Sequence, residues 1–424
     1  MMFERTLAYA SARDSADPLA RFRAQFARPV GDHGEALVYL CGHSLGLQPL
    51  LARQRLNEEL DDWAALGVRG HESARRAWIP YHEQLTAGLA ALAGAEPGEV
   101  VAMNSLTVNL HLMLASFYRP AGARNRILME ANAFPSDRHA VASQISWHGL
   151  DPAAALLELQ PADGSSQIST EQIEYFLAHR GAEVALVLWP GTQYLSGQVF
   201  DLARIAAAAR KAGCAVGFDL AHSIGNVPLS LHDSGADFAV WCSYKYLNGG
   251  PGAIGGCFVH ARHARSASLP RLAGWWGHDP LTRFAMGPAF NPAPGAPGWQ
   301  ISNPPILAAA PLLASLELFA AAGLTHLRAK SVALTGFLAF LLDSLPLEIL
   351  TPTGVAARGC QLSLRLGRDA VQGRAVFERL QGSGMVCDWR EPDVIRVAPV
   401  PLYNSFEEVF RFATALETSL REVG

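Results

Sequence analysis

Short apolar runs recur through the middle of the chain, each followed by polar or turn-forming residues. Four of them predict buried strands: RILME (126–130), EVALVLWP (183–190), CAVGFDL (214–220) and DFAVWCSY (237–244). The Ala-rich stretch 201–213 lies between two of these runs and predicts a crossover helix. Strand and helix therefore alternate, which predicts an α/β domain.

The pattern changes from about residue 306. The apolar stretch 306–324 predicts a packed helix, since Pro311 and Glu317 interrupt it in a way that does not suit a membrane span. The segments beyond it predict a smaller α+β unit, with strands at 360–366 and 394–400 and a helix at 370–382.

Length and composition divide the chain further. The chain has 424 residues, of which 50% are hydrophobic and 17% charged, so it can bury a large core. Its length predicts more than one domain. We expect a large domain over 49–324 and a small one made by 325–424, with 1–48 as an N-terminal segment. A formal net charge of −4 and no Lys/Arg run provide no basic surface, so a nucleic-acid partner is not expected. The Pro/Gly-rich stretch 286–299 predicts an ordered loop.

The cysteines and the N-terminal residues indicate a compartment. Neither CxxC nor Cys/His metal spacing occurs, so we expect reduced thiols and no metal; the six cysteines are at 41, 214, 242, 257, 360 and 387. The first residues are charged and lack the apolar core of a signal peptide. A cytoplasmic protein without a membrane segment is expected.

A lysine follows the last of the four strand-like runs, in CSYKYLNGGPGAIGG. Burying an unpaired ammonium is costly, so Lys245 either reaches solvent at the strand end or is used chemically. The preceding run ends in FDLAH, which places Asp219 and His222 at the same edge of the sheet. A pyridoxal phosphate site requires such a pair, with the lysine forming a Schiff base and the carboxylate keeping the pyridine nitrogen protonated. An ion pair that closes a strand edge explains the same spacing.

The stretch MNSLTVNLHLMLASF predicts a helix with Asn104 and Ser105 as capping residues. The backbone N–H groups of Leu106 and Thr107, with the Thr107 hydroxyl, would then face an anion such as a phosphate. Tyr244 would add its hydroxyl to that phosphate. A capped helix without a ligand and a tyrosine that only packs its ring are the alternatives.

A further aromatic precedes Pro135 in FPSD, where a strand ends and the proline predicts a turn. Phe134 would cover one face of a cofactor ring and Asp137 would reach its polar edge. The alternative is a turn with a buried aromatic side chain.

These motifs belong to a longer ordered set. The chain resembles the kynureninase family of fold-type I pyridoxal-phosphate enzymes, which are similar to class V aminotransferases. The resemblance runs nearly end to end, through HSLGLQP (43–49), GHESARRAW (70–78), MNSLTVNLH (103–111), FPSDRHA (134–140), GFDLAHSIGNVPL (217–229), CSYKYLNGGPG (242–252), GWWGHD (274–279), ISNPPIL (301–307) and IRVAPVPLYNSF (395–406).

The resemblance implies a large domain with a mostly parallel sheet flanked by helices, and a smaller α+β domain. It implies hydrolysis of the Cβ–Cγ bond of L-kynurenine to anthranilate and L-alanine. With 3-hydroxy-L-kynurenine the products are 3-hydroxyanthranilate and L-alanine. Tryptophan degradation or pyridine nucleotide synthesis is the implied pathway, and a homodimer with shared active sites is the implied assembly.

Roles for single residues come from the same resemblance. Lys245 resembles the Schiff-base lysine that also moves the Cα proton, and Asp219 the partner of the pyridine nitrogen. Tyr244 or a water would hold the oxyanion at Cγ. The remaining implied cofactor contacts are Leu106, Thr107, Phe134, Asp137, His222, Trp275 and Asn303, of which Trp275 and Asn303 would cross the dimer interface.

The implied substrate contacts divide into two ends. Arg396 resembles the arginine that binds the α-carboxylate with its planar fork, and a surface arginine is the alternative. Ser44, His71 and Asn303 resemble the lining of the aryl pocket. Two departures affect the aryl side: His43 stands where many members have asparagine, and RRAW replaces the commoner RPW.

Two other functions share part of this pattern. A cysteine desulfurase or an aminotransferase would share Lys245 and Asp219, but a desulfurase needs a cysteine on a mobile loop and no cysteine has that setting. A transcription regulator that kept the fold would carry a DNA-binding domain and a basic face, and neither is visible.

Overall fold

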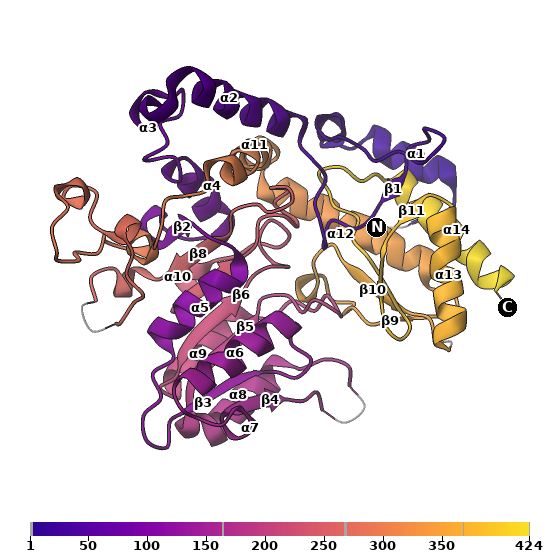
Figure 1. Cartoon of the computed structure of the whole chain (residues 1–424). Helices are drawn as coiled ribbons and strands as arrows, with labels where there is room; N and C mark the ends of the chain where they lie inside the picture. The colour runs from indigo at the N-terminus through magenta and orange to yellow at the C-terminus, as the bar shows by residue number, and fades with distance from the viewer. Residues whose placement is uncertain (1–2, 163–164, 267–268, 368, 424) are drawn as a thin grey trace.

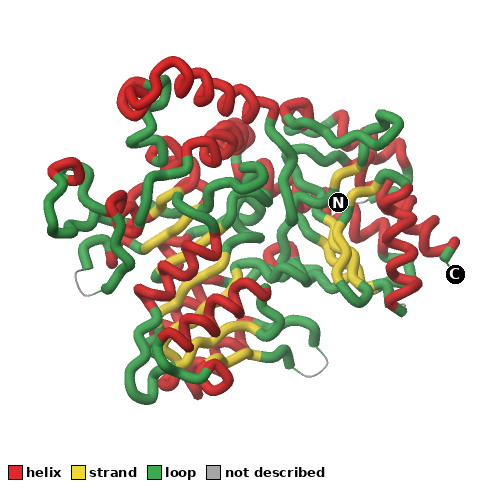
Figure 2. The backbone as a smooth tube through the Cα atoms, viewed as in Figure 1, coloured by secondary structure: helices red, strands yellow, loops and turns green. Residues whose placement is uncertain are grey.

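The computed structural model describes residues 3–162, 165–266, 269–367 and 369–423. The chain forms a larger unit around a seven-stranded sheet and a smaller unit around a four-stranded one, shown side by side in Figure 1. The helices of the larger unit lie on both sides of its sheet, as the tube in Figure 2 shows. The α/β class and the smaller α+β unit predicted from the sequence are confirmed.

The large sheet has the strand order β2-β8-β7-β6-β5-β3-β4 and is parallel except for β8. The four predicted strands are β3, β5, β6 and β7, but β7 ends before the predicted residue 244. Beyond Trp241 the backbone leaves the ladder, because the Ser243 carbonyl accepts from Gly249 N and the Tyr244 carbonyl from Gly46 N. The strand bounds are β2 Val100–Ala102, β3 Arg126–Glu130, β4 Leu156–Leu159, β5 Val184–Pro190, β6 Ala215–Asp219, β7 Phe238–Trp241 and β8 Gly256–Val259.

Alternate side chains of each strand pack against different helices. In β5, Val187 and Trp189 join the core under α4, α8, α9 and α11, whereas Leu186 and Leu188 join the core under α5 and α6. This two-sided burial explains why the strands are apolar throughout. The helix bounds are α2 Leu50–Leu66, α3 Gly70–Ser73, α4 Glu83–Ala93, α5 Leu106–Phe117, α6 Pro135–Trp147, α7 Pro152–Ala155, α8 Thr170–Arg180, α9 Leu202–Lys211, α10 Leu231–Ser234 and α11 Ile306–Ala322.

The smaller unit has an antiparallel sheet of order β12-β13-β10-β9. The N-terminal segment joins this unit, since β1 pairs in parallel with β11 and α1 packs on α14. The domain limits at 48/49 and 324/325 stay a prediction. The bounds are α1 Leu7–Ser15, β1 Val38–Tyr39, α12 Leu324–Leu342, β9 Glu348–Ile349, β10 Leu362–Arg365, α13 Ala370–Gly382, β11 Met385–Val386, β12 Asp388–Arg390, β13 Val394–Val397 and α14 Phe406–Glu422.

Helices α11 and α12 connect the two units. Gly323 separates them at a bend of 83°. Glu317 on α11 pairs with Arg55 of α2 at 2.8 Å, and Lys330 on α12 pairs with Asp17 at 2.7 Å. Among the described helices none is by itself long and apolar enough to cross a membrane, although this bent pair reaches that length and hydropathy.

Candidate active site

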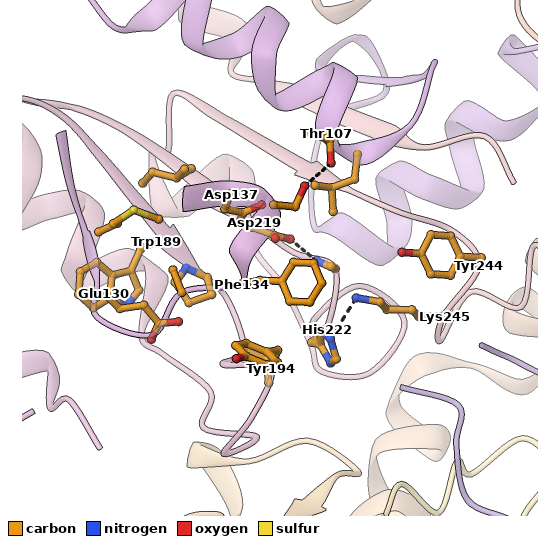
Figure 3. A pocket seen from close by; sticks show the side chains of 18 residues that line it. Thr107, Glu130, Phe134, Asp137, Trp189, Tyr194, Asp219, His222, Tyr244 and Lys245 are labelled. Carbon is orange, nitrogen blue, oxygen red and sulfur yellow. Dashed lines mark hydrogen bonds between the residues drawn. The ribbon is translucent and has the colours of Figure 1, made fainter. Parts of the chain in front are cut away.

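A cavity of about 200 Å³ lies at the carboxyl ends of β3, β5 and β6 and beside the loop after β7 (Figure 3). Parallel strands bring their carboxyl ends to one edge of a sheet, where open α/β sheets bind ligands. Eight residues predicted from the sequence line it: Leu106, Thr107, Phe134, Asp137, Asp219, His222, Tyr244 and Lys245.

Only one of the three lysines in the chain lies in this cavity. Lys211 is exposed at the end of α9, and Lys330 is buried in its pair with Asp17. Lys245 is half-buried, and its Nζ lies 3.0 Å from His222 Nε2 and 5.8 Å from the centre of the Phe134 ring. The cavity therefore contains one primary amine.

His222 is the neutral partner of that amine. Burial, followed by the charge of Lys245, holds the pKa of His222 well below its ordinary value. A neutral imidazole accepts at one nitrogen and donates at the other. Since Lys245 donates to Nε2, the proton belongs on Nδ1, which is buried and has no partner in the described part of the chain.

Two carboxyl groups lie together on the other side of the cavity. Asp219 ends β6, and its Oδ1 accepts the backbone N–H of Ala221 at 2.6 Å. Asp137 is in the first turn of α6, and burial, followed by the charge of Asp219, raises its pKa well above the ordinary value. Asp137 therefore favours its neutral form beside Asp219, and its Oδ1 has no partner among the described residues.

The start of α5 has no side-chain cap. Ser105 occupies the N-cap position, but contrary to expectation its side chain makes no capping bond. Asn104 accepts no helix N–H in the contacts of the described residues either, and its Nδ2 donates to Asn109 Oδ1 at 2.9 Å. The first N–H groups of a helix have no intrahelical acceptor, and those of Leu106 and Thr107 are accordingly left for a ligand.

Phe134 and Tyr244 bound the cavity with aromatic rings. Pro135 begins α6 and does not form the predicted turn, and Phe134 is not buried but 41% exposed. Its ring meets that of Tyr194 edge to face at 5.3 Å. The Tyr244 hydroxyl is directed into the cavity (Figure 3), and burial raises its pKa, so it carries its proton at neutral pH.

Sequence reasoning missed four polar residues of the lining. Ser136 accompanies Thr107, with the two hydroxyl oxygens 2.8 Å apart. Glu130 ends β3, and burial raises its pKa to about 8. Thr192 and Tyr194 follow β5. The signal that found Asp219, a polar residue where a buried strand ends, also marks Glu130 and Thr192.

Four other predicted residues do not line this cavity. Ser44, His71 and Asn303 are exposed, and Trp275 is 44% exposed. The His71 ring meets that of Trp78, a neighbour in its own motif, edge to face at 5.6 Å. In this single chain they do not form an aryl pocket.

Arg396 also lies outside the cavity lining, but it is buried, with an exposed fraction of 1%. It is not the surface arginine that was the alternative. Its guanidinium pairs with Asp388 and donates to the Tyr194 carbonyl at 2.6 Å, directly behind a residue of the cavity wall. His43, expected at the aryl side, is buried 3.5 Å from Asp388.

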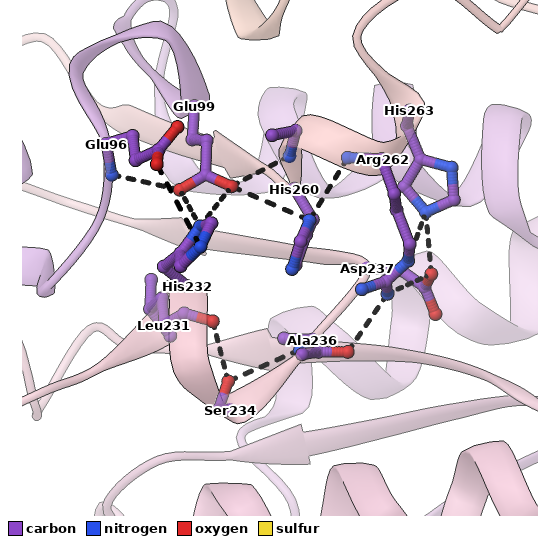
Figure 4. Close-up of polar contacts among 12 residues, drawn as sticks. Glu96, Glu99, Leu231, His232, Ser234, Ala236, Asp237, His260, Arg262 and His263 are labelled. Carbon is purple, nitrogen blue, oxygen red and sulfur yellow. Dashed lines mark hydrogen bonds and ion pairs between the residues drawn. The ribbon is translucent and has the colours of Figure 1, made fainter.

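One group of possible metal ligands occurs among the described residues, and none of its members lines the cavity: Glu99, His232 and His260. Its atoms already have partners (Figure 4). The Glu99 carboxylate accepts from the backbone N–H groups of Ala261 at 2.7 Å and Glu96 at 2.9 Å, and lies 2.9 Å from His232 Nδ1. His260 Nδ1 accepts from the backbone of Arg262. The geometry is that of a brace between the turn before β2, helix α10 and the turn after β8.

Family models match almost the whole chain. Residues 38–360 match the aminotransferase class-V family, and residues 327–416 match the kynureninase C-terminal domain. A kynureninase from Xanthomonas campestris pv. campestris (strain B100) is 58% identical over 413 residues, 97% of each chain. A kynureninase from Myxococcus xanthus (strain DK1622) is 56% identical over 424 residues, 99% of each chain.

Solved structures show the same fold at low identity. A mutant of C-DES with glycine covalently linked to its PLP cofactor has a TM-score of 0.76 at 20% identity, covering 90% of this chain and 96% of that one. The cysteine desulfurase CsdA from Escherichia coli has a TM-score of 0.76 at 17% identity, covering 95% and 98%.

The open start of α5 predicts a small effect of removing its N-cap hydroxyl. Ser105→Ala should change the free energy of unfolding by less than about 0.5 kcal/mol. Ser405 caps α14 by accepting from Glu408 N, so Ser405→Ala should cost about 1 kcal/mol. Denaturant unfolding of both variants measures the difference, and an equal loss at Ser105 would show that it caps α5.

The Glu99 brace predicts a pH-dependent stability. The hydrogen bond to Glu99 raises the pKa of His232, so this pairing stabilises the fold below about pH 6.5 and is lost as the pH rises through the raised value. Burial raises the pKa of Glu99, but hydrogen bonds from the backbone of Ala261 and Glu96 outweigh this effect and hold that pKa below its ordinary value. The stabilisation that ionised Glu99 contributes is therefore lost only as the pH falls through this lowered pKa.

Glu99→Gln should therefore lower the melting temperature most near pH 5–6 and progressively less toward pH 8–9. Glu99→Ala should cost a further ~0.5–1.5 kcal/mol for each lost hydrogen bond at every pH, since it removes the acceptor of the part-buried backbone N–H groups of Ala261 and Glu96. Thermal unfolding across this range tests both; a Glu99→Gln deficit that does not vary with pH would contradict the ion pair.

Proposed function

The chain belongs to the kynureninase family, and we propose that it hydrolyses the Cβ–Cγ bond of L-kynurenine to anthranilate and L-alanine with pyridoxal phosphate as cofactor. The relatives at 58% and 56% identity over almost all of both chains support this reaction. The structural observation that carries it is the meeting of Lys245, Asp219 and the uncapped start of α5 in one cavity. 3-Hydroxy-L-kynurenine is proposed as a second substrate.

The residues of the cavity fit pyridoxal phosphate. The N–H groups of Leu106 and Thr107, with the hydroxyls of Thr107 and Tyr244, form a donor set for the phosphate. Lys245 offers the amine for the aldehyde, and Asp219 the carboxylate for the pyridine nitrogen. When bound, this cofactor withdraws electrons from the substrate Cα, which makes the Cα proton acidic and allows the Cβ–Cγ bond to break.

The protein groups around it hold and move protons. Asp219 keeps the pyridine nitrogen protonated, and the neutral form of Asp137 avoids a second charge beside it. Lys245 removes the Cα proton and returns it, while neutral His222 accepts from the amine and fixes its direction. The half-exposed ring of Phe134 would be available to cover one face of the cofactor ring.

Hydrolysis also requires water at the aryl ketone and a donor for the oxyanion that forms at Cγ. Tyr244 retains its proton because burial raises its pKa, and its hydroxyl is directed into the cavity. A protonated phenol is a suitable donor to an oxyanion. We assign that role to Tyr244 or to an ordered water.

The substrate site needs a second copy of the chain. Arg396 would bind the α-carboxylate, while Ser44, His71 and Asn303 would meet the aryl ring. Exposed apolar side chains accompany Trp275, and such a patch marks a protein interface: Leu272, Leu281, Phe284 and Met286. A homodimer that covers them would bring Trp275 and Asn303 to the partner's cavity.

A cysteine desulfurase, as the structural neighbour CsdA is named, is disfavoured. Five of the six cysteines are buried and the sixth, Cys41, is half-buried. Burial raises the pKa of Cys41 to about 12, so its reactive thiolate is scarce at neutral pH. All six thiols are unpaired, which supports the proposed cytoplasmic location.

A direct assay tests the reaction and its lysine. Purified protein with pyridoxal phosphate should release fluorescent anthranilate from L-kynurenine. Lys245→Ala should lower turnover by at least roughly 10²–10⁴-fold and abolish the borohydride-reducible cofactor adduct. Lys211→Ala, at an exposed lysine, is the matched control and should behave as wild type. No anthranilate from the wild type, or full activity of Lys245→Ala, would refute the proposal.

Asp219→Asn tests the electronic role of the carboxylate. The variant should still bind the cofactor but exchange the substrate Cα proton in deuterated water at least roughly 100-fold more slowly. Nuclear magnetic resonance of recovered substrate measures that exchange. Near-normal exchange would mean that Asp219 only supports the fold.

A further inference from the structure

The surroundings of Arg396 leave part of its guanidinium free. Nε donates to Asp388 Oδ2 at 2.5 Å, Nη2 donates to the same oxygen, and Nη1 donates to the Tyr194 carbonyl at 2.6 Å. A guanidinium has five N–H groups. One N–H on each terminal nitrogen is therefore left without an acceptor in the described part of the chain, which suits a carboxylate with two oxygens.

Asp388 is built into the neighbouring strand as a fixed partner. It lies on β12 directly opposite Arg396 on β13 in the antiparallel register. Its Oδ2 also lies 3.1 Å from Arg390 Nε and 3.5 Å from His43 Nε2. Although burial raises it, the nearby His43 imidazole and the charge of Arg396 hold the pKa of Asp388 well below its ordinary value. Asp388 is therefore ionised at neutral pH.

The net charge of this cluster is one that a single bound anion would neutralise. Arg390 and Arg396 are positive and Asp388 is negative, while burial lowers the pKa of His43 to about 4 and keeps it neutral at pH 7. The cluster thus has a net charge of +1. A substrate carboxylate would neutralise it, whereas Arg396 and Asp388 alone would already be neutral and would offer no net attraction.

Tyr194 connects the cluster to the cavity. Its ring lines the cavity, and its centre is 6.0 Å from the Arg396 Cζ and 6.0 Å from the Arg390 Cζ. Its carbonyl accepts from Arg396 Nη1. The guanidinium is thus held on two sides, by the Asp388 carboxylate and by the backbone after β5.

We propose that Asp388 is a positioning residue that holds the Arg396 guanidinium so that its two free N–H groups receive the α-carboxylate of the substrate. The proposal rests on the function proposed above, in which Arg396 binds that carboxylate. Asp388 touches neither substrate nor cofactor, and it acts through Arg396. If Asp388 did not position Arg396, its negative charge would only repel the substrate carboxylate, and removing that charge would lower KM. If Asp388 positions Arg396, removing the charge raises KM. The direction of the change in KM therefore distinguishes repulsion from positioning.

The test compares the holoenzymes of wild type, Asp388→Asn and Asp388→Glu, with Glu391→Gln as a control at an exposed residue of the same hairpin. Asp388→Asn should raise KM for L-kynurenine roughly 10- to 100-fold, the cost of a misplaced binding group, and change kcat much less. Asp388→Glu should recover part of the loss, and Glu391→Gln should match wild type. The inhibition constant of the decarboxylated amine of kynurenine should not change in any variant.

Two results would overturn the positioning role. An unchanged or lower KM in Asp388→Asn means that Asp388 does not hold Arg396 for the substrate. An equal loss of affinity for the decarboxylated amine means a general structural effect. If thermal unfolding shows that Asp388→Asn is not folded, Asp388→Glu decides the question. Its displaced carboxylate should raise KM for L-kynurenine without changing the affinity for the decarboxylated amine. An unchanged KM for L-kynurenine in Asp388→Glu would refute the positioning role.

Arg396→Lys separates this proposal from the one on which it rests. If KM for L-kynurenine is unchanged in Arg396→Lys, Arg396 does not bind the α-carboxylate and the proposed substrate site is wrong. If Arg396→Lys raises KM but Asp388→Asn does not, the substrate site stands and only the positioning role of Asp388 fails.

Discussion

The active site depends on the energetic cost of burying ionisable side chains at one edge of the large sheet. An isolated charge in a protein interior is costly, so each must be neutralised, paired or solvated. Asp137 and Glu130 have raised pKa values, and His222 has a lowered one. Parallel strands concentrate these groups because their carboxyl ends share an edge. A cofactor with a phosphate and a protonated ring nitrogen supplies the charges that this edge lacks.

At the proposed substrate end the buried charge is that of Arg396, and it is offset by pairing within the protein. Arg396 is buried with its charge paired, because Asp388 on the adjacent strand and the Tyr194 carbonyl accept three of its five N–H groups. The arginine comes from the small unit and the carbonyl from the large one. The relative position of the two units therefore sets the distance between the amine of Lys245 and the guanidinium. The pairing of β1 with β11 and the Lys330–Asp17 pair attach the N-terminal segment to the small unit.

One chain brings together most of the proposed cofactor contacts but not the proposed contacts to the aryl ring of the substrate. Eight of the proposed cofactor contacts lie together within one chain, whereas Ser44, His71, Trp275 and Asn303 are exposed and lie outside the cavity. Exposed apolar residues on the segment around Trp275 are energetically unfavourable in a monomer. In the proposed dimer, burying this surface would also complete the proposed aryl pocket.

The sequence by itself determined what depends on neighbours along the chain. Apolar periodicity predicted β3, β5 and β6 closely, and the rule that polar residues follow buried strands located Asp219, His222 and Lys245. The same rule, applied to every strand, would have found Glu130 and Thr192. The family motifs then named a cofactor for these residues.

Only the tertiary structure decided what depends on segments far apart. The burial of Arg396 against Asp388 requires the antiparallel register of β12 and β13, and its contact with Tyr194 joins residues about two hundred positions apart. Ser105 has the residue type of a helix cap, yet Asn104 turns to Asn109 and the helix end stays open. Local sequence carries propensity and period, whereas hydrogen-bond partners and desolvation arise from packing between distant segments.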